Sequence, residues 1–318
     1  MQYFYCKRSG NVNSKYKKFT LALAILIMLG SISYNLVNLK NKKVDNKRML
    51  QNENKVLELE VNSLKDSSKL DDVKERKFDN GPLKYNNKSV PVLMYHSIDY
   101  EKDNELRVPT EKFREQMKYI KDNGYTTLTF NELYDFFINN TPVPEKSVVI
   151  TFDDGYEDNY KNAYPILKEY GINATIFVIT ATIDTDKEYL TSEQLKEMQH
   201  NDIDIESHTV KHDKLNSLSY ENQLQTLKDS KRYLEDLLNK DIKYIGYPFG
   251  IWNDDTIKAA KDAGYKMAFT TVSGWANKTQ GIYILNRVYV SSNLGMNEFI
   301  RRLTNPDYNA TNKKVHKN

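Results

Sequence analysis

Residues 147–154 read SVVITFDD, a short and mostly apolar run that ends in two adjacent aspartates. Six more short runs of this kind follow the pattern: VPVLMYH (90–96), ATIFVIT (174–180), DIDIESH (202–208), IKYIGYP (242–248), KMAFTT (266–271) and ILNRVYV (284–290). Amphipathic stretches lie between them, at 111–122, 159–170, 220–239 and 254–263. Alternating strands and helices of this kind predict an α/β domain with a largely parallel sheet. Either a barrel or a doubly wound sheet fits the pattern.

Length, charge and cysteine content exclude some classes of protein. The chain has 318 residues and 39% hydrophobic content, which suits one catalytic domain with appendages. Its formal charge of +3 is too small to indicate a nucleic-acid-binding surface, so we expect no nucleic-acid partner. The single cysteine, Cys6, cannot form an internal disulfide.

The N-terminal region predicts an attachment to a membrane. Residues 1–18 form a short basic segment that we expect to be cytoplasmic. Residues 19–39 carry no charge and are long enough to span a bilayer as one helix. A cleaved signal peptide is the alternative, because the most apolar part, 21–29, is short and small residues follow it. We expect the uncleaved anchor, with the long C-terminal part on the outer side of the cell membrane.

Polar segments flank the expected catalytic domain, which we place at 89–304. Residues 40–88 are polar, and Leu50, Leu57 and Leu64 recur at heptad spacing, so this linker is either a short helical stalk that forms oligomers or a solvated spacer. Residues 305–318 form a polar tail.

Polar residues gather at the ends of the predicted strands. His96, Asp153-Asp154, His208 and Pro248-Phe249-Gly250 each stand at the C-terminal end of an apolar run. In α/β barrels this end carries the active site. Adjacent strand residues point to opposite faces, so the two aspartates share a site only where the strand loses its regularity, and Gly155 offers a reason for that break.

The pair His208 and His212 indicates a metal site. The two imidazoles are four residues apart, so they share one face if the segment makes a helical turn. Together with one carboxylate they form a three-ligand set that leaves positions open for water and substrate, as catalytic zinc requires. The alternative for two histidines at this spacing, considered without the rest of the chain, is a pair of surface side chains that bind no metal.

The motifs TFDDG (151–155) and HTVKH (208–212) resemble the first two motifs of the polysaccharide deacetylases, also called the NodB-homology domain or carbohydrate esterase family 4. The resemblance covers about residues 90–304. It implies a distorted (β/α) barrel, a divalent metal that is often zinc, and an N-acetylated polysaccharide as substrate. It also assigns roles by position: Asp154, His208 and His212 as metal ligands, Asp153 as catalytic base, and the backbone N–H of Phe249 as a donor to the oxyanion.

Departures from the family pattern narrow the resemblance. The arginine of the third motif is replaced by Gly246, its aspartate partner is absent from 271–275, and Arg287 stands where the fifth motif has an acid histidine. These departures resemble the subgroup that deacetylates poly-β-1,6-N-acetylglucosamine, in which the acid histidine comes from an early Met-Tyr-His element. Here that element ends at His96, which this resemblance makes the acid that protonates the leaving amine. The alternative for His96 is a structural role, as a buried histidine whose ring nitrogens are hydrogen-bonded.

Four more side chains are candidates on weaker grounds. Arg287 either orients Asp153 or binds a neighbouring carboxylate for structural reasons. Tyr156, Tyr247 and Trp275 offer aromatic faces for a sugar groove, although core packing is the commoner fate of such residues.

The expected function is therefore the hydrolysis of N-acetyl groups on N-acetylglucosamine units of an extracellular or cell-wall polymer. Peptidoglycan, chitin oligomers and O-acetyl xylan remain open as substrates. A non-catalytic surface glycan-binding protein on the same fold is the main alternative from another class. A glycosidase is disfavoured, because adjacent aspartates rarely reach the carboxyl separation of about 5 to 9.5 Å that its mechanisms use.

Overall fold

The computed structural model describes residues 76–78 and 81–309. The predicted cytoplasmic segment, the membrane anchor and most of the linker lie outside these residues, as does most of the tail. Among the described residues, no helix is both long and apolar enough to cross a membrane. A two-residue strand, β1 (Leu83–Lys84), falls within the range expected to be linker and pairs with β4 (Val143–Pro144).

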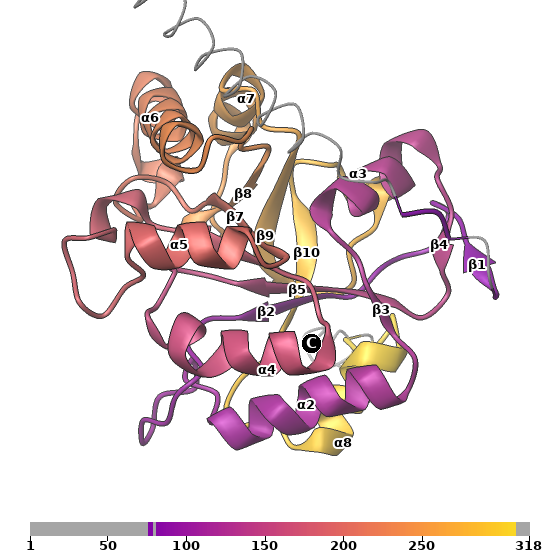
Figure 1. Cartoon of the computed structure of the whole chain (residues 1–318). Helices are drawn as coiled ribbons and strands as arrows, with labels where there is room; N and C mark the ends of the chain where they lie inside the picture. Colours follow the sequence, from indigo (N-terminus) through magenta and orange to yellow (C-terminus); the bar gives the residue numbers. More distant parts are fainter. Residues whose placement is uncertain (1–75, 79–80, 310–318) are drawn as a thin grey trace, which may run out of the picture. The chain divides into compact units, whose positions relative to one another are not determined.

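Seven parallel strands close into a barrel, which decides between the two architectures that the sequence left open (Figure 1). In sheet order they begin with β2 and end with β5, and the pairing of β2 with β5 closes the ring. A short strand, β3 (Thr126–Thr127), pairs with the first two residues of β5. All seven predicted strands are confirmed, as β2 (Val92–Tyr95), β5 (Ser147–Phe152), β6 (Ala174–Val178), β7 (Ile203–Ser207), β8 (Tyr244–Gly246), β9 (Met267–Ser273) and β10 (Leu285–Tyr289).

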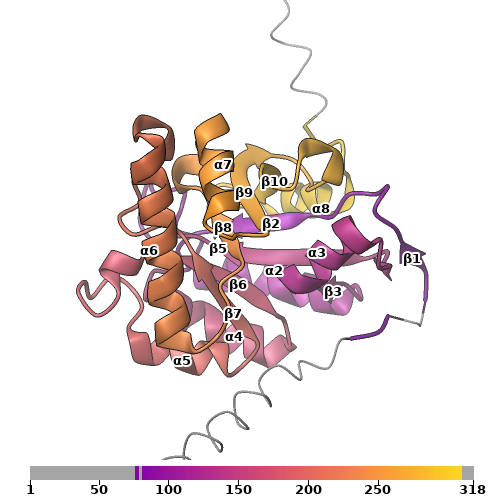
Figure 2. The same cartoon turned by 90° about the horizontal axis from the view of Figure 1, so that it is seen from above.

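Helices cover the outside of the barrel, as both views show (Figures 1 and 2). The four predicted amphipathic stretches are helical, and three further helices were not predicted. Several helices end at a glycine in the left-handed region, such as Gly171 with φ 63°, which starts the turn into the next strand. The helices are α2 (Thr110–Asp122), α3 (Phe130–Asn139), a π-helical turn η1 (Asn159–Ala163) continued by α4 (Tyr164–Tyr170), α5 (Ser192–Gln199), α6 (Tyr220–Leu238), α7 (Asp254–Asp262) and α8 (Met296–Thr304).

The core has two parts. One lies between the strands and the outer helices, and the other fills the barrel and continues under α3. Phe130, at the start of α3, stacks on Phe269 with ring centroids 4.5 Å apart and meets Tyr244 edge-on. This packing fills the barrel interior beside β8 and β9.

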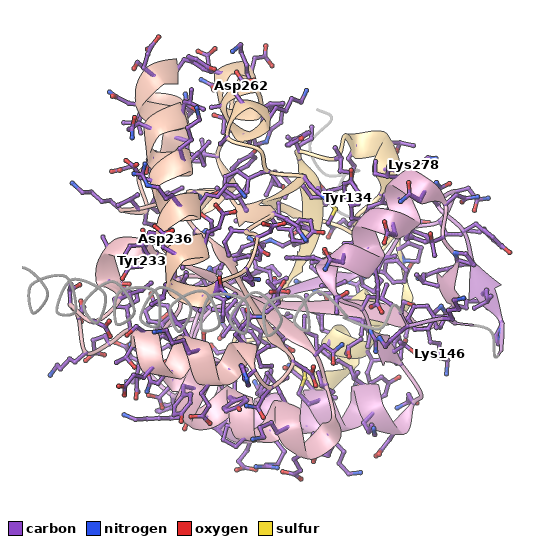
Figure 3. All side chains as sticks on the ribbon, turned by 45° about the horizontal axis from the view of Figure 1, so that its top comes forward. Tyr134, Lys146, Tyr233, Asp236, Asp262 and Lys278 are labelled. Carbon is purple, nitrogen blue, oxygen red and sulfur yellow. The ribbon has the colours of Figure 1, made fainter. Side chains whose placement is uncertain are left out.

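Charged side chains spread over the outside of the domain (Figure 3). Lys146, Asp236, Asp262 and Lys278, labelled there, are all exposed. Buried charges are few among the described residues, and each of them needs a partner.

Candidate active site and metal centre

The two aspartates after β5 reach one site because the strand ends before them. β5 ends at Phe152, and Asp154 and Gly155 then take φ values of 72° and 79°. These left-handed values turn the chain out of the extended strand geometry, and glycine adopts them without strain. A Cβ at Gly155 would lie 2.9 Å from Cγ1 of Val178, so glycine also permits close packing on β6. The predicted loss of strand regularity is confirmed.

Asp154, His208 and His212 come together as a candidate metal site. Their ligand atoms all lie within 4.8 Å of one another. The Nε2 atoms of His208 and His212 stand 3.4 and 3.3 Å from the same oxygen, Oδ1 of Asp154. That oxygen is buried and accepts no hydrogen bond from the described residues. A buried carboxylate oxygen that faces two imidazole nitrogens fits a divalent cation.

His208 is held in the tautomer that a metal ligand needs. Its Nδ1 lies 2.7 Å from the carbonyl oxygen of Gly246, so Nδ1 carries the proton and Nε2 keeps its lone pair. A Cβ at Gly246 would meet Nδ1 at 3.2 Å, which explains why a small residue stands there. The sequence predicted none of this support.

The helical turn that was the condition for placing the two histidines on one face does not form. The segment after β7 (Ile203–Ser207) is a loop in which Thr209 and His212 have φ values of 70° and 59°. The N–H of His212 donates to Oγ1 of Thr209 at 3.1 Å and closes the turn. Left-handed residues, rather than helix geometry, bring the two rings to 4.9 Å between centroids.

Asp153 is bound by Arg287 across the barrel. Nη1 and Nη2 of Arg287 donate to Oδ1 and Oδ2 at 2.6 and 2.7 Å, and both residues are buried. Arg287 also donates to the carbonyl of Thr270 and to Oγ1 of Thr151, so its plane is fixed. Burial opposes ionisation of Asp153, but the guanidinium outweighs it and holds the pKa of this carboxyl well below its usual range. The contact fits the orienting role that was one of two alternatives for Arg287.

His96 faces the other side of Asp153. Its Nε2 lies 3.9 Å from Oδ2 of Asp153, and its Nδ1 is buried without a partner among the described residues. Burial lowers the pKa of His96, whereas the carboxylates of Asp153 and Asp154 oppose this effect. The predicted acid and the predicted base are therefore neighbours, although they are far apart in the sequence.

A polar clamp holds the loop that carries His96. Asn159 donates from Nδ2 to the carbonyl of His96 at 2.8 Å. Asp158 accepts from the Ser97 hydroxyl at 2.6 Å and from the Ile98 N–H at 2.7 Å. These contacts come from the turn before α4, where the backbone becomes π-helical, a feature common at functional sites. The sequence prediction missed both clamp residues, although they follow the TFDDG motif by only a few positions.

Phe249 and Tyr247 have opposite environments. Phe249 has φ 57° and is 49% exposed, with its ring centroid 4.5 Å from that of His212. Its main chain therefore lies at the candidate site. Tyr247, by contrast, is fully buried in the core between barrel and helices, so its side chain cannot line a sugar groove as expected.

Of the other two aromatic candidates, only Tyr156 lies beside the metal ligands. It lines a cavity of about 320 Å³ together with Asp154 and His212, and its ring stacks on Tyr189 at 5.1 Å. No sequence pattern pointed to Tyr189. Trp275 lies at the other end of the barrel, where it lines a different pocket and donates from Nε1 to the carbonyl of Arg302. It does not contribute to a groove at this site.

Comparison with known proteins agrees with this geometry. Residues 140–268 match the family model described as polysaccharide deacetylase. The chain is 46% identical to YxkH of Bacillus subtilis, described as a candidate polysaccharide deacetylase, over 66% of this chain and 74% of that protein. It is 31% identical to a poly-β-1,6-N-acetyl-D-glucosamine N-deacetylase of Staphylococcus aureus, over 66% of this chain and 81% of that protein.

A solved structure is also similar. The Streptococcus pyogenes deacetylase PplD, determined in complex with acetate, shares 35% identity and a TM-score of 0.65, over 68% of this chain and 98% of that one.

Proposed function

Because this chain belongs to the polysaccharide deacetylase family, we propose that it is a metal-dependent hydrolase that removes N-acetyl groups from N-acetylglucosamine units of an extracellular or cell-wall polysaccharide. We propose poly-β-1,6-N-acetylglucosamine as its substrate. The observation that carries this choice is His96, which stands beside Asp153 in the absence of a fifth-motif histidine. The relative from Staphylococcus aureus, which bears the name of that activity, supports it.

We propose Zn²⁺ as the metal. Asp154, His208 and His212 would hold it through one carboxylate oxygen and two imidazole nitrogens, a donor set that suits catalytic zinc. When bound, such a cation lowers the pKa of a water molecule and polarises the acetamide carbonyl.

The remaining residues divide the proton transfers. Asp153, kept ionised and oriented by Arg287, accepts a proton from the attacking water as its oxygen bonds to the acetamide carbon. Charge then develops on the carbonyl oxygen, where the backbone N–H of Phe249 is the proposed donor. The carbon–nitrogen bond breaks as His96 delivers a proton to the leaving nitrogen, giving acetate and a free amine.

Substrate rings would enter over the cavity beside the metal ligands. Tyr156 and Tyr189 form one stacked wall there, and the exposed ring of Phe249 lies against His212. Flat aromatic faces of this kind suit pyranose rings.

We also propose that residues 19–39 anchor the protein in the cell membrane with the catalytic domain on the outer side. The uncharged length of this segment supports the proposal. Treating intact cells with protease should remove the catalytic domain while leaving cytoplasmic markers intact. Protection of the domain until the cells are lysed would contradict this location.

One experiment tests reaction and substrate together. Acetate release is measured with poly-β-1,6-N-acetylglucosamine, chitin oligomers and peptidoglycan fragments, on enzyme stripped with chelator and on enzyme reloaded with zinc. We expect release from poly-β-1,6-N-acetylglucosamine, loss after stripping and recovery after reloading. Faster release from either other glycan would overturn the substrate, and no stoichiometric metal with no release from any glycan would favour a glycan-binding protein.

A further inference from the structure

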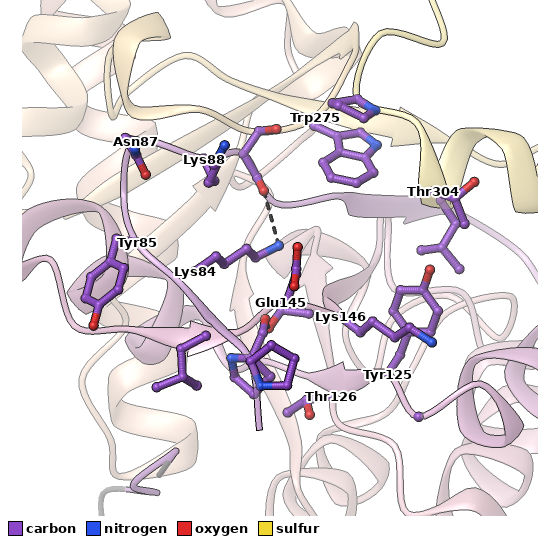
Figure 4. Close-up of a pocket in the computed structure, with 18 residues that line it drawn as sticks. Lys84, Tyr85, Asn87, Lys88, Tyr125, Thr126, Glu145, Lys146, Trp275 and Thr304 are labelled. Atoms are coloured by element: carbon purple, nitrogen blue, oxygen red, sulfur yellow. Dashed lines mark hydrogen bonds between the residues drawn. The ribbon is translucent and has the colours of Figure 1, made fainter. Parts of the chain in front are cut away.

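A second pocket lies at the opposite end of the barrel from the metal ligands. Figure 4 shows the residues that line it. Its volume of about 960 Å³ is within the range of small-molecule sites. Ser147, the first residue of β5, lines it, whereas Asp153 and Asp154 follow the last residue of the same strand. At about 3.3 Å per residue, the two sites are roughly 20 Å apart.

Lys84, on β1, is the unusual side chain of this pocket. It is only 8% exposed, yet its Nζ makes a single hydrogen bond to the described residues, to the carbonyl of Ser89 at 3.2 Å. An ammonium has three donors, so its other two are unused by these residues. Burial lowers the pKa of Lys84 to about 8, although Glu145 opposes the shift.

Lys240, a partly buried lysine, has the carboxylate partners that Lys84 lacks. Lys240 forms salt bridges with both Asp204 and Glu206, and its pKa is raised despite burial. No carboxylate of the described residues lies within salt-bridge distance of Lys84. A desolvated ammonium without an anion is costly, so its position in a pocket points to an anion supplied by a ligand.

The rest of the pocket wall adds positive charge and flat rings. Lys88 and Lys146 join Lys84 there, against the one acid Glu145. Trp275 and Tyr125 also line it, and the Trp275 ring centroid lies 5.8 Å from Nζ of Lys84 (Figure 4). The hydrogen bond from Nε1 of Trp275 to Arg302 fixes that ring in place.

We propose that this pocket binds an acidic sugar, a pyranose ring bearing a carboxylate, with the carboxylate on Lys84 and the ring against Trp275. The carboxylate completes the hydrogen bonds of the buried ammonium. The ring contact selects a sugar over a simple anion. This site is separate from the deacetylation chemistry and does not depend on it.

Binding can be followed with trigalacturonate, an oligosaccharide of carboxylated pyranoses, through tryptophan fluorescence. The chain has two tryptophans, so Trp252→Phe leaves Trp275 as the only reporter. We expect a saturable change with trigalacturonate and none with the neutral maltotriose at equal concentration. Lys84→Met should weaken binding by about tenfold or more. Acetate release should be unchanged in Lys84→Met, since Lys84 lies far from the catalytic residues.

Lys258→Met is the matched control. Lys258 also stands over an aromatic ring, Tyr220 at 4.1 Å, but it does not line the pocket. This variant should bind trigalacturonate like the parent. Equal weakening in both lysine variants, or no binding below about 10 mM, would overturn the proposal. Competition by inorganic phosphate at equal concentration would reduce the site to a general anion site and overturn the sugar assignment.

A measurement on the parent protein guards against misfolding of the variants, and Lys84→Met serves only to assign one signal. Reductive methylation with ¹³C-formaldehyde labels the lysines, and the signal missing from Lys84→Met identifies Lys84. Its titration midpoint should rise when trigalacturonate is added, because a bound carboxylate favours the charged amine. An unchanged midpoint at saturating sugar would contradict contact with Lys84.

Discussion

Two carboxyl groups of the same barrel, each paired with a basic side chain, have pKa values shifted in opposite directions. At the C-terminal ends of the strands, Arg287 binds Asp153 through two hydrogen bonds of 2.6 and 2.7 Å and lowers its pKa. Near the beginning of β8, Lys240 is shared between Asp204 and Glu206, and burial raises the pKa of Glu206 to about 8 although Lys240 opposes it.

The difference lies in the cation. A guanidinium has two parallel donors that match one carboxylate, so it fixes both the charge and the orientation of Asp153. A lysine is a single point charge, and here it is divided between two acids. Glu206 is instead held by the backbone N–H groups of Lys243 and Tyr244, which tie β7 to β8. One pair prepares a base for chemistry, and the other joins strands.

Among the substitutions that test this contrast, we expect the largest loss of activity from Asp153→Asn. The amide cannot accept the proton of the attacking water, so acetate release should fall by about 10³-fold. Zinc content should stay at the parental level, because Asp153 is not among the three clustered ligands. Release is measured by acetate assay and zinc by elemental analysis. Activity close to that of the parent would sink the assignment of Asp153 as base.

His96→Ala comes next in expected size. Removing the proposed acid should lower turnover by about 10²-fold with little change in metal content. The loss should shrink with an activated acetyl ester, whose leaving group needs no protonation. Equal losses on ester and amide would show that His96 supports the site in another way. Asn159→Ala, which frees the His96 carbonyl, should give a smaller loss of the same kind.

Much of this architecture could be predicted from the sequence, because strand ends are local features. Apolar runs followed by His96, Asp153 or His208 place polar groups at one end of the barrel without any knowledge of pairing. Closure of the barrel could not be predicted, since it depends on β2 meeting β5. The pair of Arg287 with Asp153, which joins residues 134 positions apart, was one of two alternatives between which the sequence could not choose.

Errors arose where local geometry or packing overrode a simple pattern. The spacing of His208 and His212 suggested a helical turn, but left-handed residues produce the contact instead. Tyr247 and Trp275 looked suitable for a sugar groove, yet one is buried and the other lies at the far end of the barrel. Aromatic residue type alone does not report which face of the barrel a ring occupies.

Arg287→Lys tests the geometric part of the contrast with a smaller expected effect. A lysine keeps the charge but loses the paired donors, so kcat should fall by about tenfold while KM changes little. The pKa of Asp153 should rise, because the bidentate contact that lowers it is gone. The base is active when ionised. As the pH is lowered, the variant should therefore lose activity at a higher pH than the parent does. A pH–rate profile with an unmoved acid limb would contradict this role.

Glu206→Gln should have the smallest effect and touch stability alone. Acetate release should stay within about twofold of the parent, because Glu206 contacts none of the candidate catalytic groups. The folded pKa of Glu206 is raised from 4.5 to about 8, so the fold favours its protonated form. Its contribution to stability is therefore full below pH 4.5 and is lost as the pH rises through about 8. The glutamine variant should flatten the dependence of Tm on pH across this window. An unchanged slope would mean that Glu206 stays ionised like Asp153, and the two pairs would then differ only in position.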